Sequence, residues 1–240
     1  MILYGRNPVY EALRGRRAAN VSEVWATAPA AREPWLVRVN PRIVTAGEIE
    51  RRCGSSSHQG VCADAGSYPY ASAERLLDGA QPMIVALDQI QDPQNLGSIC
   101  RTAECTGAGG VVIPERRAAE VTPAVCKASA GAVEHLSVAR VRNVADFLAD
   151  ARRADCWCYG ASGDDDRAVA YDAPDYAGSG VVLVLGSEGS GLRPRVAKAC
   201  DALIALPQRG RVQSLGVSAA AAAILYEILQ QREGSLDNSP

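Results

Sequence analysis

From residue 82 onward, short apolar runs alternate with segments of helical pattern. Runs such as MIVALDQI (83–90) and GVVLVLG (180–186) contain few polar residues, which is typical of strands buried on both faces of a parallel sheet. The sequence therefore predicts an α/β fold with a parallel sheet covered by helices on both faces. The expected strands are residues 83–90, 109–114, 136–141, 156–162, 180–186 and 202–207, and the expected helices are residues 96–106, 119–130, 143–153, 191–199 and 214–232.

The N-terminal part of the chain predicts a smaller α/β unit. In NPVYEALRG, Asn7 is a candidate N-cap and Pro8 suits the first helical position. VSEVWAT and GVCAD have strand composition, and GSYPYASAE is typical of a linker. We therefore expect one domain over residues 1–75 and a second over residues 76–235. The final GSLDNSP predicts an unstructured tail.

Charge is unevenly distributed along the chain. Residues 1–60 hold nine arginines and five acidic residues, and the rest of the chain holds 16 basic and 22 acidic residues, which gives the net charge of −2. This net charge argues against a strongly basic nucleic-acid-binding protein. The basic N-terminal part is nevertheless compatible with a polyanionic partner. An unevenly charged solvated surface is the alternative explanation.

Composition also bears on localisation. No apolar run approaches the ~20 residues of a membrane span. The first residues lack the basic and apolar regions of a signal peptide. We therefore expect a cytoplasmic protein.

The chain lacks the ligand clusters of a metal site. Its eight cysteines are scattered without a C-x-x-C pair, and it has only two histidines. We expect no bound metal, and cysteines that pack as small apolar residues. The run from Asp164 to Asp166 is interpreted as a solvated loop. His58 is interpreted as a packed loop histidine, with RNA contact as the alternative.

Three predicted strand ends carry unusual residues, and ligands bind beyond the carboxyl ends of parallel strands. After the strand at 83–90, Asn95 and Gly97 precede Arg101, which we expect in the first or second turn of the next helix. An arginine near the positive end of the helix dipole does not stabilise that helix, but it suits an anion such as phosphate. Taken alone, the spacing is more simply explained by a salt-bridged surface arginine and an Asn95 cap.

The second strand end is GSEGSGL, which follows the strand at 180–186. Its glycine spacing differs from the dinucleotide fingerprint, and no G-K-[ST] follows, which excludes a P-loop. A turn explains the glycines, but Glu188 is a lone carboxylate where functional residues gather. At the third strand end, Pro207 and Gly210 end the strand, and Ser214 is a candidate cap for an alanine-rich helix.

In order and spacing, the three motifs resemble those of the SpoU-type, or TrmH-like, RNA 2′-O-ribose methyltransferases of the trefoil-knotted SPOUT class. Asn95-x-Gly97-x-x-x-Arg101 matches the first family motif, Gly186-x-Glu188-Gly189-x-Gly191 the second, and residues 207–218 the third. YGRNPVYEAL and HQGVCA resemble the family's N-terminal substrate-binding domain. The resemblance covers nearly the whole chain.

The resemblance implies a fold, a cofactor and a site. It implies a deep C-terminal trefoil knot, a homodimer, and S-adenosylmethionine bent against the backbone of the knotted loops. The implied cofactor contacts are Gly186, Ser187, Gly191, Leu206 and Leu215, and the implied catalytic residues are Arg101, Asn95, Glu188 and Ser214. We expect Arg101 to clamp the target phosphate and Glu188 to orient it. The implied substrate is a guanosine ribose in large-subunit ribosomal RNA, and transfer RNA is the alternative.

One position departs from the family pattern. The family reads Ser-Leu-Asn-Val-Ser where this chain has Gly216 in place of Asn. Without that amide, either Glu188 or Ser218 finds another partner, or activity is reduced. Losing one hydrogen bond to a charged group costs ~1.5–3 kcal/mol, or ~10–100-fold in rate. A catalytically weakened RNA-binding protein of the same fold is therefore a further alternative.

Overall fold

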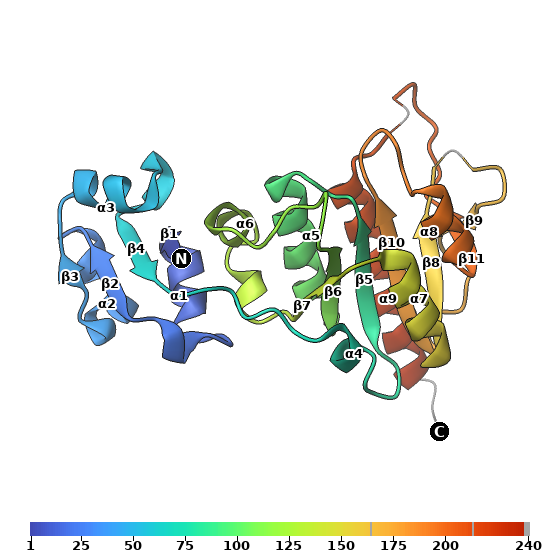
Figure 1. Cartoon of the computed structure of the whole chain (residues 1–240), viewed down its shortest axis with the longest axis horizontal. Helices are drawn as coiled ribbons and strands as arrows, with labels where there is room; N and C mark the ends of the chain where they lie inside the picture. Colours follow the sequence, from blue (N-terminus) through green and yellow to red (C-terminus); the bar gives the residue numbers. More distant parts are fainter. Residues whose placement is uncertain (164, 213, 238–240) are drawn as a thin grey trace. The chain divides into compact units, whose positions relative to one another are not determined.

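The computed structural model describes residues 1–163, 165–212 and 214–237. The chain forms two compact units (Figure 1). Unit 1 comprises Met1–Pro69 and Glu120–His135, and unit 2 comprises Tyr70–Ala119 and the described residues from Leu136 onward. The sequence did not indicate that residues 120–135 leave the second unit to join the first. The domain boundary near residue 75 stays a prediction.

Unit 1 is built around a four-stranded sheet of order β1-β4-β2-β3. β1 and β2 run antiparallel to β4, and β3 runs parallel to β2. The strands are β1 (Ile2–Tyr4), β2 (Glu23–Ala26), β3 (Arg42–Ile43) and β4 (Val61–Asp64), and the helices are α1 (Arg6–Ala12), α2 (Pro34–Val39), α3 (Ala46–Cys53) and α6 (Pro123–Ala128). Short 3-10 turns are η1 (Ala18–Asn20), η2 (Ala30–Arg32), η3 (Ser56–His58) and η4 (Ala132–Glu134).

The first helix begins earlier than expected. α1 starts at Arg6 and its N-cap is Gly5, so the prediction of Asn7 as N-cap is wrong. Gly5 has a φ of 96°, which glycine adopts without a Cβ penalty. This turn lets the helix start directly after β1. His58 is buried and accepts a 2.8 Å hydrogen bond from the Gly60 N–H at Nδ1, which confirms the packed interpretation.

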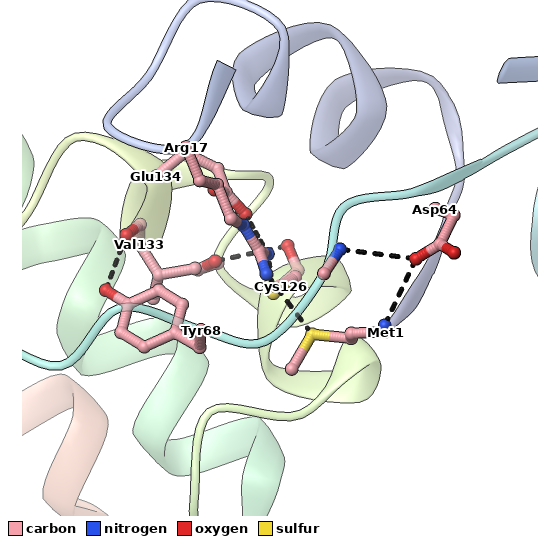
Figure 2. Close-up of polar contacts among 9 residues, drawn as sticks. Met1, Arg17, Asp64, Tyr68, Cys126, Val133 and Glu134 are labelled. Carbon is pink, nitrogen blue, oxygen red and sulfur yellow. Dashed lines mark hydrogen bonds and ion pairs between the residues drawn. The ribbon is translucent and has the colours of Figure 1, made fainter. Parts of the chain in front are cut away.

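A buried ion pair joins residues 120–135 to the rest of unit 1 (Figure 2). The Arg17 guanidinium donates to both carboxylate oxygens of Glu134, at 2.6 and 2.7 Å, and both side chains are fully buried. Arg17 also lies over the Tyr68 ring, whose hydroxyl donates to the Val133 carbonyl at 2.7 Å. Because an unpaired buried charge is costly, these contacts fix η4 onto the N-terminal part of the chain.

Unit 2 contains a seven-stranded sheet of order β7-β6-β5-β10-β8-β11-β9, in which every neighbouring pair is parallel. Its strands are β5 (Met83–Asp88), β6 (Gly110–Pro114), β7 (Val138–Val141), β8 (Cys156–Ala161), β9 (Val169–Ala170), β10 (Gly180–Gly186) and β11 (Ala202–Ala205). The predicted α/β class and all six expected strands are confirmed. The edge strand β9 was not predicted, because two exposed residues leave no periodic pattern.

Helices cover both faces of this sheet (Figure 1). α4 (Ala73–Leu76), α7 (Val144–Arg153) and α8 (Pro194–Ala199) pack in one core cluster with residues such as Ile84, Val112 and Val182. α5 (Pro93–Cys105) and α9 (Val217–Asp237) pack against each other, and they contact β6 and β10 respectively. Burial on both faces explains the continuous apolar runs of β5 and β10.

Helix ends differ from the sequence prediction for identifiable reasons. α5 begins at Pro93 with Asp92 as its N-cap, so Asn95 is not the cap. At 3.6 residues per turn, this start places Arg101 in the third turn, so its prediction in the first or second is wrong. α6 begins at Pro123, where Thr122 caps the helix by accepting from the Val125 N–H. Proline at the first helical position sets the start of α5, α6 and α8.

The C-terminal helix also differs from expectation. α9 begins at Val217, and the Gly216 carbonyl accepts its first helical bond, from Ala220. Ser214 instead accepts from the Gly216 N–H at 3.2 Å, so the prediction that Ser214 caps this helix is wrong. α9 continues to Asp237, which overturns the expected tail for residues 234–237, and residues 238–240 lie outside the described part.

All eight cysteines are free thiols. Five are buried, as predicted, and burial raises the pKa of Cys62 and Cys126 to about 12, whereas Cys105 is exposed. Among the described residues, no group of three or more His, Cys, Asp or Glu side chains is placed to hold a metal. No helix in the described ranges has the length and apolarity to cross a membrane.

Candidate functional site

A cavity of about 480 Å³ lies at the carboxyl edge of the unit 2 sheet. It is enclosed by the ends of β8, β10 and β11 and by the start of α9. Most of its lining is small side chains and backbone, contributed by Ala161–Gly163, Asp165, Leu185–Leu192, Ala197, Leu203–Leu206, Gln208, Ser214–Val217, Ala220 and Ile224. Its size and its place beyond parallel strand ends suit a small organic ligand.

A tight turn after β10 forms one wall of the cavity. Ser187 and Gly191 exchange two backbone hydrogen bonds, of 2.9 and 3.1 Å. Gly189 and Gly191 have φ values of 84° and 62°, and a Cβ on Gly186 would lie 2.2 Å from the Gly191 carbonyl carbon. The glycine spacing is therefore required by the turn itself. The turn presents Glu188 at its exposed tip.

An ion pair between Asp88 and Arg193 anchors this turn to β5. Asp88 is fully buried at the end of β5, in register with Gly186. The Arg193 N–H donates to Oδ2 at 2.9 Å, and its guanidinium Nε donates to Oδ1 at 2.7 Å. Sequence reasoning missed this pair. An aspartate closing an otherwise apolar strand was the available signal, because a buried carboxylate needs a partner.

The loop before α9 forms another part of the lining. It brings Leu206, Ser214 and Leu215 to the cavity. Gly216 has a φ of 85°, and a Cβ built on it would meet only Glu188 Oε1, at 3.9 Å. The position at which the chain departs from the family pattern therefore faces the Glu188 carboxylate.

Ser218 connects the first and third motifs. Its hydroxyl donates a 2.6 Å hydrogen bond to Asn95 Oδ1, which joins the first turn of α9 to the first turn of α5. The missing amide left open whether Glu188 or Ser218 finds another partner, and Ser218 has one in Asn95. Glu188 has none: no side-chain hydrogen bond or ion pair links it to residues 1–163, 165–212 or 214–237.

The structure brings seven of the nine predicted site residues together. Gly186, Ser187, Glu188, Gly191, Leu206, Ser214 and Leu215 line the cavity. The Asn95 side chain is held by the hydrogen bond from Ser218 of α9. Arg101 is exposed and does not line the cavity, and its side chain bonds to none of the described residues. The expected Arg101–Glu188 pair is therefore not formed.

The cavity can hold a ligand that is read mainly by backbone groups. More than half of its lining residues are Gly, Ala or Ser, whose short side chains leave backbone groups accessible. Its carboxylates are Glu188 and Asp165, and hydrogen bonds from Arg167 lower the pKa of Asp165 to about 2. Because Arg167 offsets the charge of Asp165, Glu188 is the carboxylate of the lining that suits a ligand with positive charge.

Comparison with known proteins places this arrangement in a family. Residues 82–226 match the SpoU rRNA Methylase family, and residues 2–71 match the RNA 2′-O ribose methyltransferase substrate binding family. YacO of Bacillus subtilis (strain 168), assigned by name to the TrmH family tRNA/rRNA methyltransferases, is 42% identical over 186 residues, covering 74% of this chain and 72% of YacO. An uncharacterized tRNA/rRNA methyltransferase of Mycobacterium sp. (strain KMS) is 37% identical over 96% of this chain and 76% of its own length.

A solved structure shows the same fold. The AdoMet-bound rRNA methyltransferase from Sinorhizobium meliloti superposes with a TM-score of 0.80 and 26% identity, covering 95% of this chain and 86% of that chain.

Proposed function

Because the chain belongs to the SpoU family of RNA methyltransferases, we propose that it transfers the methyl group of S-adenosylmethionine to a ribose 2′-hydroxyl of RNA. The observation that carries this proposal is the cavity formed by the second and third motif loops at the carboxyl edge of the sheet. The match of residues 2–71 to the substrate-binding family supports the ribose 2′-hydroxyl as the methylated group.

Small residues and backbone groups would hold the cofactor. The turn after β10 would contact the cofactor through Gly186, Ser187 and Gly191. The loop between β11 and α9 would add apolar contacts from Leu206 and Leu215. When bound, S-adenosylmethionine supplies a methyl group on a sulfonium, which is a good leaving group. Glu188 stands close enough to the cavity to stabilise that positive charge.

Positioning should supply most of the catalysis, because the leaving group needs no assistance. Arg101 has no partner among the described residues, so its guanidinium is available to clamp a phosphate of the RNA and to stabilise developing alkoxide. Glu188 would then pair with Arg101 once RNA is bound. Ser218 holds the Asn95 side chain at the start of α5 by a hydrogen bond. Ser214 adds a hydroxyl group to the lining of the cavity.

We further propose that the substrate is a guanosine of large-subunit ribosomal RNA in the cytoplasm, with transfer RNA as the alternative. The loop before α9 would form a trefoil knot. A homodimer would form through the knotted region and α9, on which Tyr226 is 53% exposed and near which Val212 is 78% exposed.

A second candidate function is RNA binding with weakened catalysis. It is favoured by Gly216, which leaves Glu188 without an amide partner. Calorimetric titration with S-adenosylmethionine and transfer of a labelled methyl group to bulk RNA separate the two. Turnover that yields 2′-O-methylated nucleotides supports the enzyme, whereas binding without turnover supports the second candidate. Mapping ribose methylation in cells lacking the protein would identify the nucleotide.

A further inference from the structure

We propose that unit 2 itself carries an RNA-binding surface, a basic track made of Arg116, Arg117 and Arg142 at the carboxyl ends of β6 and β7. The identity of the ligand as RNA rests on the proposed function. The inference adds a path: the RNA backbone would reach the site over the carboxyl ends of β6 and β7.

The three arginines are brought together by sheet topology. β6 and β7 are parallel neighbours in register from Val111–Val138 to Pro114–Val141, so the residues that follow them share one edge. Arg116 and Arg117 lie in the turn after β6, and Arg142 follows β7 directly. All three are exposed, and their side chains bond to none of the described residues.

Neighbouring contacts hold the turn after β6 in place. The Glu115 N–H donates to the Val141 carbonyl at 2.9 Å, and the Ala119 N–H donates to the Ile90 carbonyl at 2.8 Å. Arg140 donates to the Glu115 carbonyl at 3.4 Å. The turn is therefore bonded to the strand ends on both sides, which presents its arginines from a fixed backbone.

Arg117 occupies a conformation that a simple turn would give to glycine. Its φ is 59°, in the left-handed region, where a side chain that is not Gly, Asn or Asp is uncommon. Such strain persists where the surroundings over-determine it, and it gathers at functional sites. Gln59, Gln89 and Ala130 share this conformation, so it is the charge of the exposed Arg117 side chain that points to an anionic partner.

The other half of the edge carries mixed charge. The segment after β8 carries Asp165 and Asp166, Asp172 follows β9, and Arg209 and Arg211 follow β11. Arg167 is bound to Asp165 at 2.6 Å, so charges of the two signs nearly balance there. The track instead concentrates three positive charges, with Glu115 as the one carboxylate directly beside it in the chain.

The test compares two double variants of the full chain. Arg116→Ala with Arg117→Gly removes two charges from the track and relieves the left-handed strain, so the variant should melt at or above the wild-type temperature. Arg75→Ala with Arg153→Ala removes two exposed charges from α4, which precedes β5, and from the last turn of α7, which precedes β8. Both control positions therefore lie toward the amino edge of the sheet.

Binding is measured by filter retention of end-labelled ribosomal RNA purified from cells lacking the protein, at several salt concentrations, with methylation of the same RNA. We expect the track variant to bind several-fold more weakly, with a salt slope smaller by about 2, and to bind S-adenosylmethionine as wild type does. The control should match wild type. If both double variants bind RNA equally tightly and methylate it at the wild-type rate, the track is overturned and the proposed function stands. A wild-type protein that neither binds nor methylates RNA would overturn the proposed function as well.

Discussion

Gly216 lies beside the Glu188 carboxylate in the lining of the cavity, with 3.9 Å between the position of a Cβ and Oε1. The space for a side chain is therefore present, although the backbone at a φ of 85° favours glycine. Ser218, which the missing amide could have left without a partner, is bound to Asn95. The departure from the family pattern therefore affects Glu188 rather than the helix junction.

Gly216→Asn should preserve or raise methyl transfer. The amide would donate to Glu188, a bond worth ~1.5–3 kcal/mol, and asparagine tolerates positive φ better than most residues. Because the left-handed backbone at Gly216 offsets part of that gain, we expect turnover between wild type and about tenfold above it. Gly216→Ala is the matched control, because it carries the backbone strain without the amide. Turnover that falls equally in both variants would show that the amide has no role.

The Asp88–Arg193 pair should set cofactor affinity through the turn after β10. Arg193→Ala removes the guanidinium from a fully buried carboxylate and leaves it only the backbone N–H of residue 193. We expect a loss of about 3 kcal/mol in stability, the low end for a broken buried pair because Arg193 is 42% exposed. S-adenosylmethionine should bind more weakly by calorimetry. The double change Asp88→Asn with Arg193→Gln should recover part of the stability, and unchanged affinity in Arg193→Ala would contradict the anchoring role.

The Arg17–Glu134 pair should stabilise unit 1 without affecting the cofactor site. Glu134→Ala leaves a buried guanidinium unpaired, which costs about 3–5 kcal/mol. Hydrogen exchange should become faster at amides of β1, β4 and η4, while cofactor affinity stays at the wild-type value. Arg17→Met with Glu134→Leu removes both charges and should destabilise less. Equal protection of unit 1 in wild type and Glu134→Ala would refute this role.

The sequence allowed the sheet of unit 2 to be predicted because its strands are buried on both faces and leave continuous apolar runs. It did not reveal that residues 120–135 join unit 1. That assignment depends on Glu134 meeting Arg17, which is 117 residues away in the chain, and no local pattern carries such a pairing. Prolines begin α5, α6 and α8, but the expected bounds missed these starts. No local signal shows that Gly216 delays α9 past Ser214.

Arg101 is the final test of the catalytic assignment. If its free guanidinium clamps phosphate and stabilises the alkoxide, Arg101→Ala should lower turnover by at least ~10²-fold, as for other lost transition-state donors. Cofactor affinity should change little, because Arg101 does not line the cavity. Arg101→Lys should recover little, since a point charge cannot reproduce a planar fork. Single-turnover methylation and calorimetry measure the two effects separately, with Arg75→Ala as an exposed helical control. Wild-type turnover in Arg101→Ala would remove Arg101 from the mechanism and leave the cavity residues to account for catalysis.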